Sequence, residues 1–217
     1  MAAIACILFP DFTQLDLTGP YEVFHRMPDA VVYVAAASGE PVESEGGLAI
    51  VPTLTFDELP PCDVLFVPGG PGVNEAMLDE QLIGVLQLHA ARASWVTSAC
   101  TGSLLLGAAG LLAGNEATTH WASLEFLAAF GAWPKRERVV VSGNRITGAG
   151  VTAGIDVALR IAAEVYGARV AEEIRVAIEY GAPETSPEVR EAVERRLSKM
   201  KIARGRAVEE AARKLSS

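Results

Sequence analysis

The sequence has few cysteines, and they lie far apart. Cys6, Cys62 and Cys100 are the only three among 217 residues, and they form no Cys-x-x-Cys pair. Such spacing suggests neither a disulfide framework nor a zinc site, and it fits a reducing compartment. We therefore expect a cytoplasmic protein without a metal site.

Positive charge and long apolar runs are also scarce. The chain carries 18 Lys and Arg against 27 Asp and Glu, a net charge of -9, which argues against nucleic-acid binding over most of its surface. No apolar stretch reaches membrane-spanning length, and the chain enters an apolar run at Ile4 without a basic n-region or a cleavage site. We expect no nucleic-acid partner, no membrane insertion and no export.

The hydrophobic pattern predicts an α/β fold. Half of the residues are hydrophobic but only 6% are aromatic, which suits a parallel sheet covered by helices. Apolar runs typical of strands alternate with longer segments typical of helices. The predicted strands are 3–9, 31–36, 63–68 and the run from Trp95. The predicted helices are 74–91, 103–112, 121–130, 152–166 and 168–180, with another opening at Pro20 after a loop over 11–16.

Two shorter segments complete this pattern. Residues 48–54 suggest a hairpin-like excursion, and Ser142-Gly143-Asn144 predicts a hairpin between 139–141 and 145–147. We expect one doubly wound parallel sheet flanked by helices, similar to flavodoxin, in a single domain over 1–217. Sites in such sheets lie at the carboxyl ends of the strands. The loop 11–16, Gly69-Gly70 and Cys100 should therefore meet at one edge.

The stretch from Trp95 to Ser103, WVTSACTGS, predicts a nucleophile elbow. A strand-like run ends on Cys100, and an apolar helix follows at once, which would aim the helix N-terminus at the sulfur and favour the thiolate. Small neighbours and Gly102 suit a tight turn. The alternative is a buried cysteine that serves as a small apolar residue.

The end of the chain differs in charge from the rest. Residues 188–217 hold nine of the 18 Lys and Arg, interleaved with five Glu and with no aromatic residue. We expect 184–217 to be a charged, solvated helical segment. The alternative is a tail that binds a nucleic acid or a protein partner.

Several motifs together resemble the ThiJ/PfpI superfamily, whose fold is like that of class I glutamine amidotransferases. They are FPDF at 9–12, LDLTGPYEVF at 15–24, VPGGPG at 67–72, SACTG at 98–102 and THW at 119–121. The LDLTGP form is similar to two branches, the isocyanide hydratases and the ligand-binding domains of AraC-type regulators. The chain ends without room for paired helix-turn-helix units, so it looks more like a stand-alone isocyanide hydratase, a lyase.

The resemblance assigns roles to individual residues. It makes Cys100 the nucleophile, Asp16 the acid/base group and Thr101 a neighbouring hydroxyl, and it implies a homodimer with a small-molecule substrate and no cofactor. A carboxyl near a thiolate should have its pKa raised. The alternative for Asp16 is an Asx-turn or helix-entry residue ahead of Pro20. The family's proline-rich loop is replaced here by ETSP at 184–187, which puts the size of the substrate in question.

Two further positions each allow two roles. His120 follows Cys100 by twenty residues, a separation seen in superfamily members that are proposed to use a Cys-His pair, but it is equally plausible as a packed residue. Gly69-Gly70 is either a simple turn or a loop whose Gly70 N–H binds an anion.

Three other functions stay open. A glyoxalase- or deglycase-like enzyme would act on small carbonyls, and it would favour Glu over Asp at position 16. A redox sensor or ligand-binding module would oxidise Cys100 without turnover. A regulator-derived domain would work with a DNA-binding partner, and the basic tail is its only support.

Overall fold

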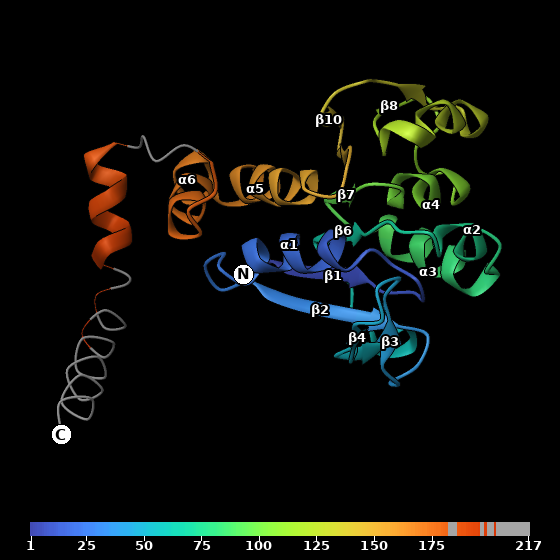
Figure 1. The fold of residues 1–217 in the computed structure, drawn as a ribbon, viewed down its shortest axis with the longest axis horizontal. Coiled ribbons are helices and arrows are strands. Elements are labelled where there is room, and N and C mark those ends of the chain that lie inside the picture. The colour runs from blue at the N-terminus through green and yellow to red at the C-terminus, as the bar shows by residue number, and fades with distance from the viewer. Residues whose placement is uncertain (182–185, 196–197, 199–201, 203–217) are drawn as a thin grey trace.

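The fold centres on one seven-stranded sheet (Figure 1). The computed structural model of the chain describes residues 1–181, 186–195, 198 and 202. The strands lie in the order β10 (Val139–Ser142), β11 (Arg145–Gly148), β7 (Trp95–Ser98), β6 (Val64–Val67), β1 (Ala3–Ile7), β2 (Val31–Ala36) and β5 (Leu54–Thr55). All neighbours are parallel except β10 and β11. The predicted α/β sheet is confirmed, with one antiparallel edge strand.

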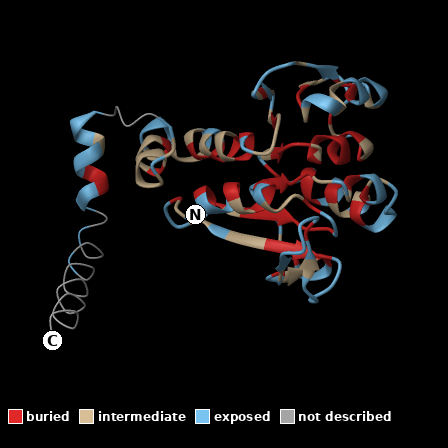
Figure 2. Cartoon of the chain, in the orientation of Figure 1, coloured by how far each residue is buried: buried red, intermediate tan, exposed pale blue. Residues whose placement is uncertain are grey.

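Two groups of helices flank these strands (Figure 1). One group is α1 (Gln14–Phe24), α5 (Ala153–Tyr166) and α6 (Ala168–Ala177), and α5 contacts both of the others. The second is α2 (Val73–Ala76), α3 (Glu80–Ala90) and α4 (Gly102–Ala108). Burial is deepest where the strands meet these helices (Figure 2), and every residue of β6 is buried. Such burial on both faces explains why its sequence is a continuous apolar run.

Smaller elements complete the described chain. They are β3 (Val42–Glu43) paired with β4 (Ala49–Ile50), the 3-10 helix η1 (Phe56–Glu58), β8 (Glu116–Ala117) paired with β9 (Trp133–Pro134), and the 3-10 helix η2 (Trp121–Phe130). The hairpin predicted at 142–144 is confirmed as β10–β11. The excursion predicted at 48–54 instead spans β3 and β4, because 54–55 pair with β2 in the main sheet.

Helix α1 begins earlier than the sequence predicts. The N–H of Thr13 donates to the carbonyl of Gly69 at 2.8 Å, and this long-range contact precedes a helix that opens at Gln14. Asp16 therefore lies in the first turn of α1 rather than in a loop, and Pro20 lies inside the helix. Since proline has no N–H, Pro20 cannot donate to the Asp16 carbonyl four residues before it.

Four other predicted helices also change, and the one predicted over 103–112 already ends at Ala108. The helix predicted over 74–91 is divided, because Oδ1 of Asp79 accepts from the N–H groups of Gln81 and Leu82 and starts α3 there. Residues 121–130 form a 3-10 helix, and the helix from 168 ends at Ala177. Of the charged segment predicted at 184–217, residues 187–195 are helical and most of the remainder lies outside the described residues. Within the described part of the chain, no helix is long and apolar enough to cross a membrane.

Candidate active site

Cys100 lies on the predicted elbow between β7 and α4. Its φ is 53°, a left-handed conformation that non-glycine residues rarely adopt. The turn is fixed through the Cys100 carbonyl, which accepts from the Thr119 hydroxyl at 2.9 Å and from the Ser103 hydroxyl at 3.2 Å. Sequence reasoning assigned no role to either hydroxyl, although both residues stand within the motifs quoted above.

Asp16 faces Cys100 from the first turn of α1. Its side chain is fully buried, and Oδ2 accepts from the Gly69 N–H at 3.0 Å. Oδ1 has no hydrogen-bond partner among the described residues. Since a buried polar atom is normally paired, and a side-chain hydrogen bond with Cys100 contributes to the pKa of Asp16, the neighbouring thiol is the natural partner of this carboxyl.

Burial controls the protonation of this pair. Loss of solvent raises the pKa of the Asp16 carboxyl from 3.8 to about 7, and hydrogen bonds to Cys100 and Gly69 oppose this rise. Burial and the Asp16 charge raise the pKa of the Cys100 thiol to about 12. The predicted direction of the Asp16 pKa is confirmed, but its main cause is burial rather than a neighbouring thiolate. The prediction of a resting thiolate is wrong, because burial outweighs the donors at the helix N-terminus.

Thr101 and the glycine pair align these two groups. The Thr101 backbone N–H and hydroxyl both lower the pKa of Cys100, so they stabilise negative charge on the sulfur. The Thr101 hydroxyl also accepts from the Gly70 N–H at 2.9 Å. The amide predicted to bind an anion therefore already has an acceptor, as does that of Gly69. A Cβ on Gly69 would lie 2.5 Å from the Thr101 nitrogen and 2.9 Å from Oδ2 of Asp16, so only glycine fits here.

A cavity of about 730 Å³ opens over Cys100 and Thr101. Its wall is largely apolar, a composition typical of small-molecule sites. The apolar lining residues include Val73, Met77, Leu104, Phe126 and Phe130.

His120 also lines this cavity, but it has a structural partner. Its Nδ1 accepts from the Ala122 N–H at 3.4 Å and caps η2. Within the described part of the chain, no hydrogen bond joins His120 to Cys100. This geometry favours the packed role over a Cys-His pair.

The other two cysteines do not line the cavity. Cys6 lies in β1 and Cys62 precedes β6, and both are buried. Burial raises the pKa of both thiols, that of Cys62 to about 11. Among the described residues, no group of three or more His, Cys, Asp or Glu side chains is placed to hold a metal ion.

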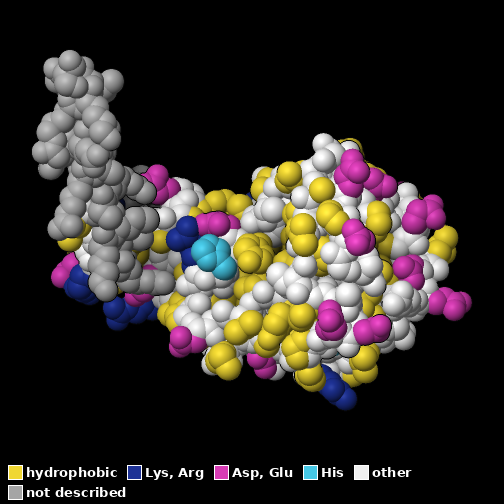
Figure 3. All heavy atoms as spheres, turned by 90° about the horizontal axis from the view of Figure 1, so that it is seen from below, with side chains coloured by type: hydrophobic (Ala, Val, Ile, Leu, Met, Phe, Trp, Pro, Cys, Tyr) yellow, Lys and Arg dark blue, Asp and Glu magenta, His cyan; other side chains and the backbone are white. Residues whose placement is uncertain are grey.

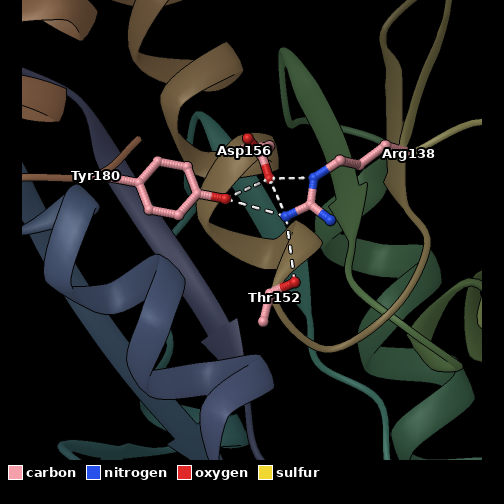
Figure 4. Close-up of polar contacts among 4 residues, drawn as sticks. All are labelled: Arg138, Thr152, Asp156 and Tyr180. Atoms are coloured by element: carbon pink, nitrogen blue, oxygen red, sulfur yellow. Dashed lines mark hydrogen bonds and ion pairs between the residues drawn. The ribbon is translucent and has the colours of Figure 1, made fainter. Parts of the chain in front are cut away.

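A polar cluster anchors the first turn of α5 (Figure 4). Oδ2 of Asp156 accepts from Nε of Arg138 at 2.7 Å and from the Tyr180 hydroxyl at 2.9 Å. Nη2 of Arg138 donates to the Thr152 hydroxyl at 3.2 Å and to the Tyr180 oxygen at 3.0 Å. The cluster thus joins the segment before β10, the start of α5 and the residues that follow α6.

The first turn of α5 lies next to both the Cys100 elbow and helix α1, which carries Asp16. Val151 lines the cavity, and a Cβ on Gly154 would lie 3.3 Å from the Cβ of Ala99 and 2.9 Å from Cγ of Pro20. Ala99 precedes Cys100, and Pro20 lies one turn beyond Asp16. The start of α5 therefore packs against the elbow and against the helix that carries the carboxyl.

Comparisons with known proteins identify the family and the fold. The sequence profile of the DJ-1/PfpI family matches residues 2–164. An isonitrile hydratase of Pseudomonas putida is 46% identical over 223 aligned positions, which cover 98% of this chain and 97% of that protein. The crystal structure of a ThiJ/PfpI family protein from Pseudomonas syringae, 42% identical, superposes with a TM-score of 0.81 over 91% of this chain and 86% of that one. Drosophila melanogaster DJ-1beta, 22% identical, shares the fold with a TM-score of 0.77 over 83% of this chain and 99% of that one.

Proposed function

This chain belongs to the DJ-1/PfpI family, and we propose that it is an isocyanide hydratase, an enzyme that converts R–NC and water into the N-substituted formamide R–NH–CHO. The observation that carries the proposal is the buried Asp16 carboxyl beside the Cys100 thiol. Cys100 lines a largely apolar cavity of a size and character suited to a small molecule, and the buried Asp16 carboxyl lies behind it. The near-full-length similarity to an isonitrile hydratase supports the same reaction.

In the first half of the reaction, Cys100 adds to the isocyanide carbon. The thiol holds its proton at rest, so the Asp16 carboxylate takes that proton as the sulfur–carbon bond forms. The carbon then carries a lone pair, and Asp16 returns the proton to it. The product is the thioimidate R–N=CH–S–Cys100, and Asp16 is again a carboxylate.

In the second half, water adds to the thioimidate carbon. The Asp16 carboxylate takes a proton from the water as the oxygen–carbon bond forms, and it passes this proton to the nitrogen. The tetrahedral adduct then collapses: a C=O bond forms, the carbon–sulfur bond breaks, and Asp16 transfers the hydroxyl proton to the departing sulfur. Cys100 is regenerated as a thiol and the formamide leaves.

The pKa of Asp16 fits both halves. A group that both accepts and donates protons works best when its pKa is near the working pH, and burial raises the pKa of Asp16 to about 7. The short aspartate side chain also leaves more space for water beside the sulfur than a glutamate would.

The decisive experiment is turnover of a small neutral isocyanide, with formamide measured by mass spectrometry. Cys100→Ala and Asp16→Asn should abolish turnover, and His120→Ala should reduce it far less. The kcat/KM of the wild-type protein should rise with pH through about 7, because the first step needs the Asp16 carboxylate. Formation of lactate from methylglyoxal, without formamide from any isocyanide, would instead identify a glyoxalase.

We also propose that the enzyme acts as a cytoplasmic homodimer. Large apolar side chains are exposed on α1, at Leu15 and Tyr21, and on η2, at Trp121 and Phe126, and burial between two copies would stabilise a dimer. The three described cysteines are all free thiols, which suits a reducing compartment. Light scattering of the purified protein tests the dimer, and cell fractionation tests the compartment.

A further inference from the structure

The described residues that line the active-site cavity include a negatively charged side chain but no Lys or Arg. Glu45 is the one carboxylate among the lining residues in the described part of the chain, and none of them is Lys or Arg. The other polar lining side chains include Asn74 and Ser123, which carry no charge, and His120, an imidazole. The cavity that receives the substrate therefore offers negative charge and no fixed positive charge.

Glu45 is held in place although its side chain is exposed. Its Oε1 accepts from the Thr13 hydroxyl at 2.7 Å, and its backbone N–H donates to the carbonyl of Phe12 at 3.1 Å. Ser44 forms a parallel bridge with Phe12. The segment that carries Glu45 is thus tied to the residues that lead into α1, the helix that holds Asp16.

We propose that Glu45 makes this enzyme select isocyanides by the charge of their R group, so that neutral and cationic substrates are accepted and carboxylate-bearing ones are rejected. The inference rests on the proposed hydratase activity and extends it to a substrate class. The apolar wall holds the hydrocarbon part of R, and Glu45 acts on any charge that R carries.

The charge of Glu45 reaches the reacting groups, since it contributes to raising the pKa of Asp16. The chain as a whole also disfavours carboxylate-bearing substrates, because its net charge is -9. On the face shown in Figure 3, Asp and Glu side chains are spread over the body of the domain, whereas Lys and Arg are few. Variants at position 45 separate the effect of the Glu45 charge from that of the net negative charge of the whole protein.

The test compares three isocyanides of matched length. One carries a terminal dimethylamino group that is protonated at pH 7, one is its hydrocarbon isostere, and one ends in a carboxylate. The kcat/KM of each is measured for the wild-type protein, for Glu45→Gln and for Glu45→Lys. Glu40→Gln is the matched control, because it removes one exposed negative charge from the same region without lining the cavity.

We expect the wild-type protein to prefer the neutral substrate over the carboxylate by about tenfold, the scale of one partly screened charge pair near a surface. Glu45→Gln should remove most of this preference, and Glu45→Lys should reverse it. The preference is taken as the ratio of the two kcat/KM values within one variant, so that a general change in rate through the pKa of Asp16 cancels. Glu40→Gln should behave like the wild type. Raising the ionic strength from about 0.01 M to about 1 M should weaken the preference, because the screening length falls from about 30 Å to about 3 Å.

Two results would overturn the inference, and they differ in meaning. The first result is that the wild-type protein hydrates the neutral isocyanide but has equal kcat/KM for the cationic and the carboxylate substrates, or that Glu45→Gln and Glu40→Gln change the preference equally. Either finding would refute charge selection and leave the hydratase activity intact. Failure to hydrate even the neutral isocyanide would refute the proposed function and this inference with it.

Discussion

Replacing Asp16 with asparagine should stabilise the folded protein at neutral and alkaline pH while it abolishes turnover. The amide has nearly the same shape as the carboxyl, and its oxygen can still accept from the Gly69 N–H. What the variant loses is a negative charge in a fully buried position. A buried carboxylate is unfavourable, so the substitution relieves a destabilising feature that the reaction needs.

The size and sign of the effect follow from proton linkage. Burial raises the pKa of Asp16 from 3.8 to about 7, so between these values the folded state binds the proton and the unfolded state does not. The stability of the wild-type protein should therefore decrease as the pH rises from about 4 to about 7, relative to the variant. A tenfold change in proton affinity is worth about 1.4 kcal/mol, so the full difference above pH 7 is about 4 kcal/mol.

The assay is chemical denaturation of both proteins at a series of pH values between 4 and 8. The two curves should coincide near pH 4 and separate by about 4 kcal/mol near pH 8, which corresponds to a melting temperature on the order of 10 °C higher for the variant. Asp57→Asn is the control, because it removes an exposed carboxyl in η1 and shows what the loss of a surface charge does. A stability difference that does not change with pH would show that Asp16 is an ordinary carboxyl, and the proposed proton transfers would then fail.

Three further perturbations test other parts of the site. Iodoacetamide should label Cys100 before Cys62, as peptide mass spectrometry can show, because only Cys100 of the two lines the cavity, although burial raises its pKa to about 12 and that of Cys62 only to about 11. Earlier labelling of Cys62 would show that the lower pKa, and not access from the cavity, decides which thiol reacts. Gly69→Ala should lower kcat at least about tenfold with the protein still folded by circular dichroism, since the new Cβ would displace the groups that align the reactants. Tyr180→Phe should lower stability by about 1 kcal/mol and raise KM more than it lowers kcat, because its hydroxyl anchors Asp156 beside the cavity wall; unchanged steady-state kinetics would show that the cluster has no influence on the site.

Local signals in the sequence predict much of the fold and the centre of the site. The elbow at Cys100 is readable because its small residues and the adjoining strand and helix are contiguous in the chain. The meeting of Asp16, Gly69 and Cys100 follows from the rule that parallel strands end at one edge. These predictions need no knowledge of tertiary contacts beyond the order of the strands.

The features that sequence reasoning missed depend on contacts between distant segments. Helix α1 starts at Gln14 after a hydrogen bond from Thr13 to Gly69, 56 residues later in the chain. The thiol state of Cys100 depends on burial by residues that the local sequence does not reveal. Thr119 supports the elbow and Glu45 reaches the cavity only because other strands bring them there.

The peptide that follows β6 makes catalysis sensitive to the pairing register of the central sheet. Gly69 donates its N–H to Asp16 and accepts the N–H of Thr13 through its carbonyl. If β6 were shifted by one residue in the direction that brings Pro68 to this position, the carboxyl would lose its donor, because proline has no N–H. A misfolded form with this shift could still bury the apolar side chains of β6, yet it would be inactive. Recovery of turnover during refolding would therefore report correct strand register, which a measurement of helix content or compactness does not.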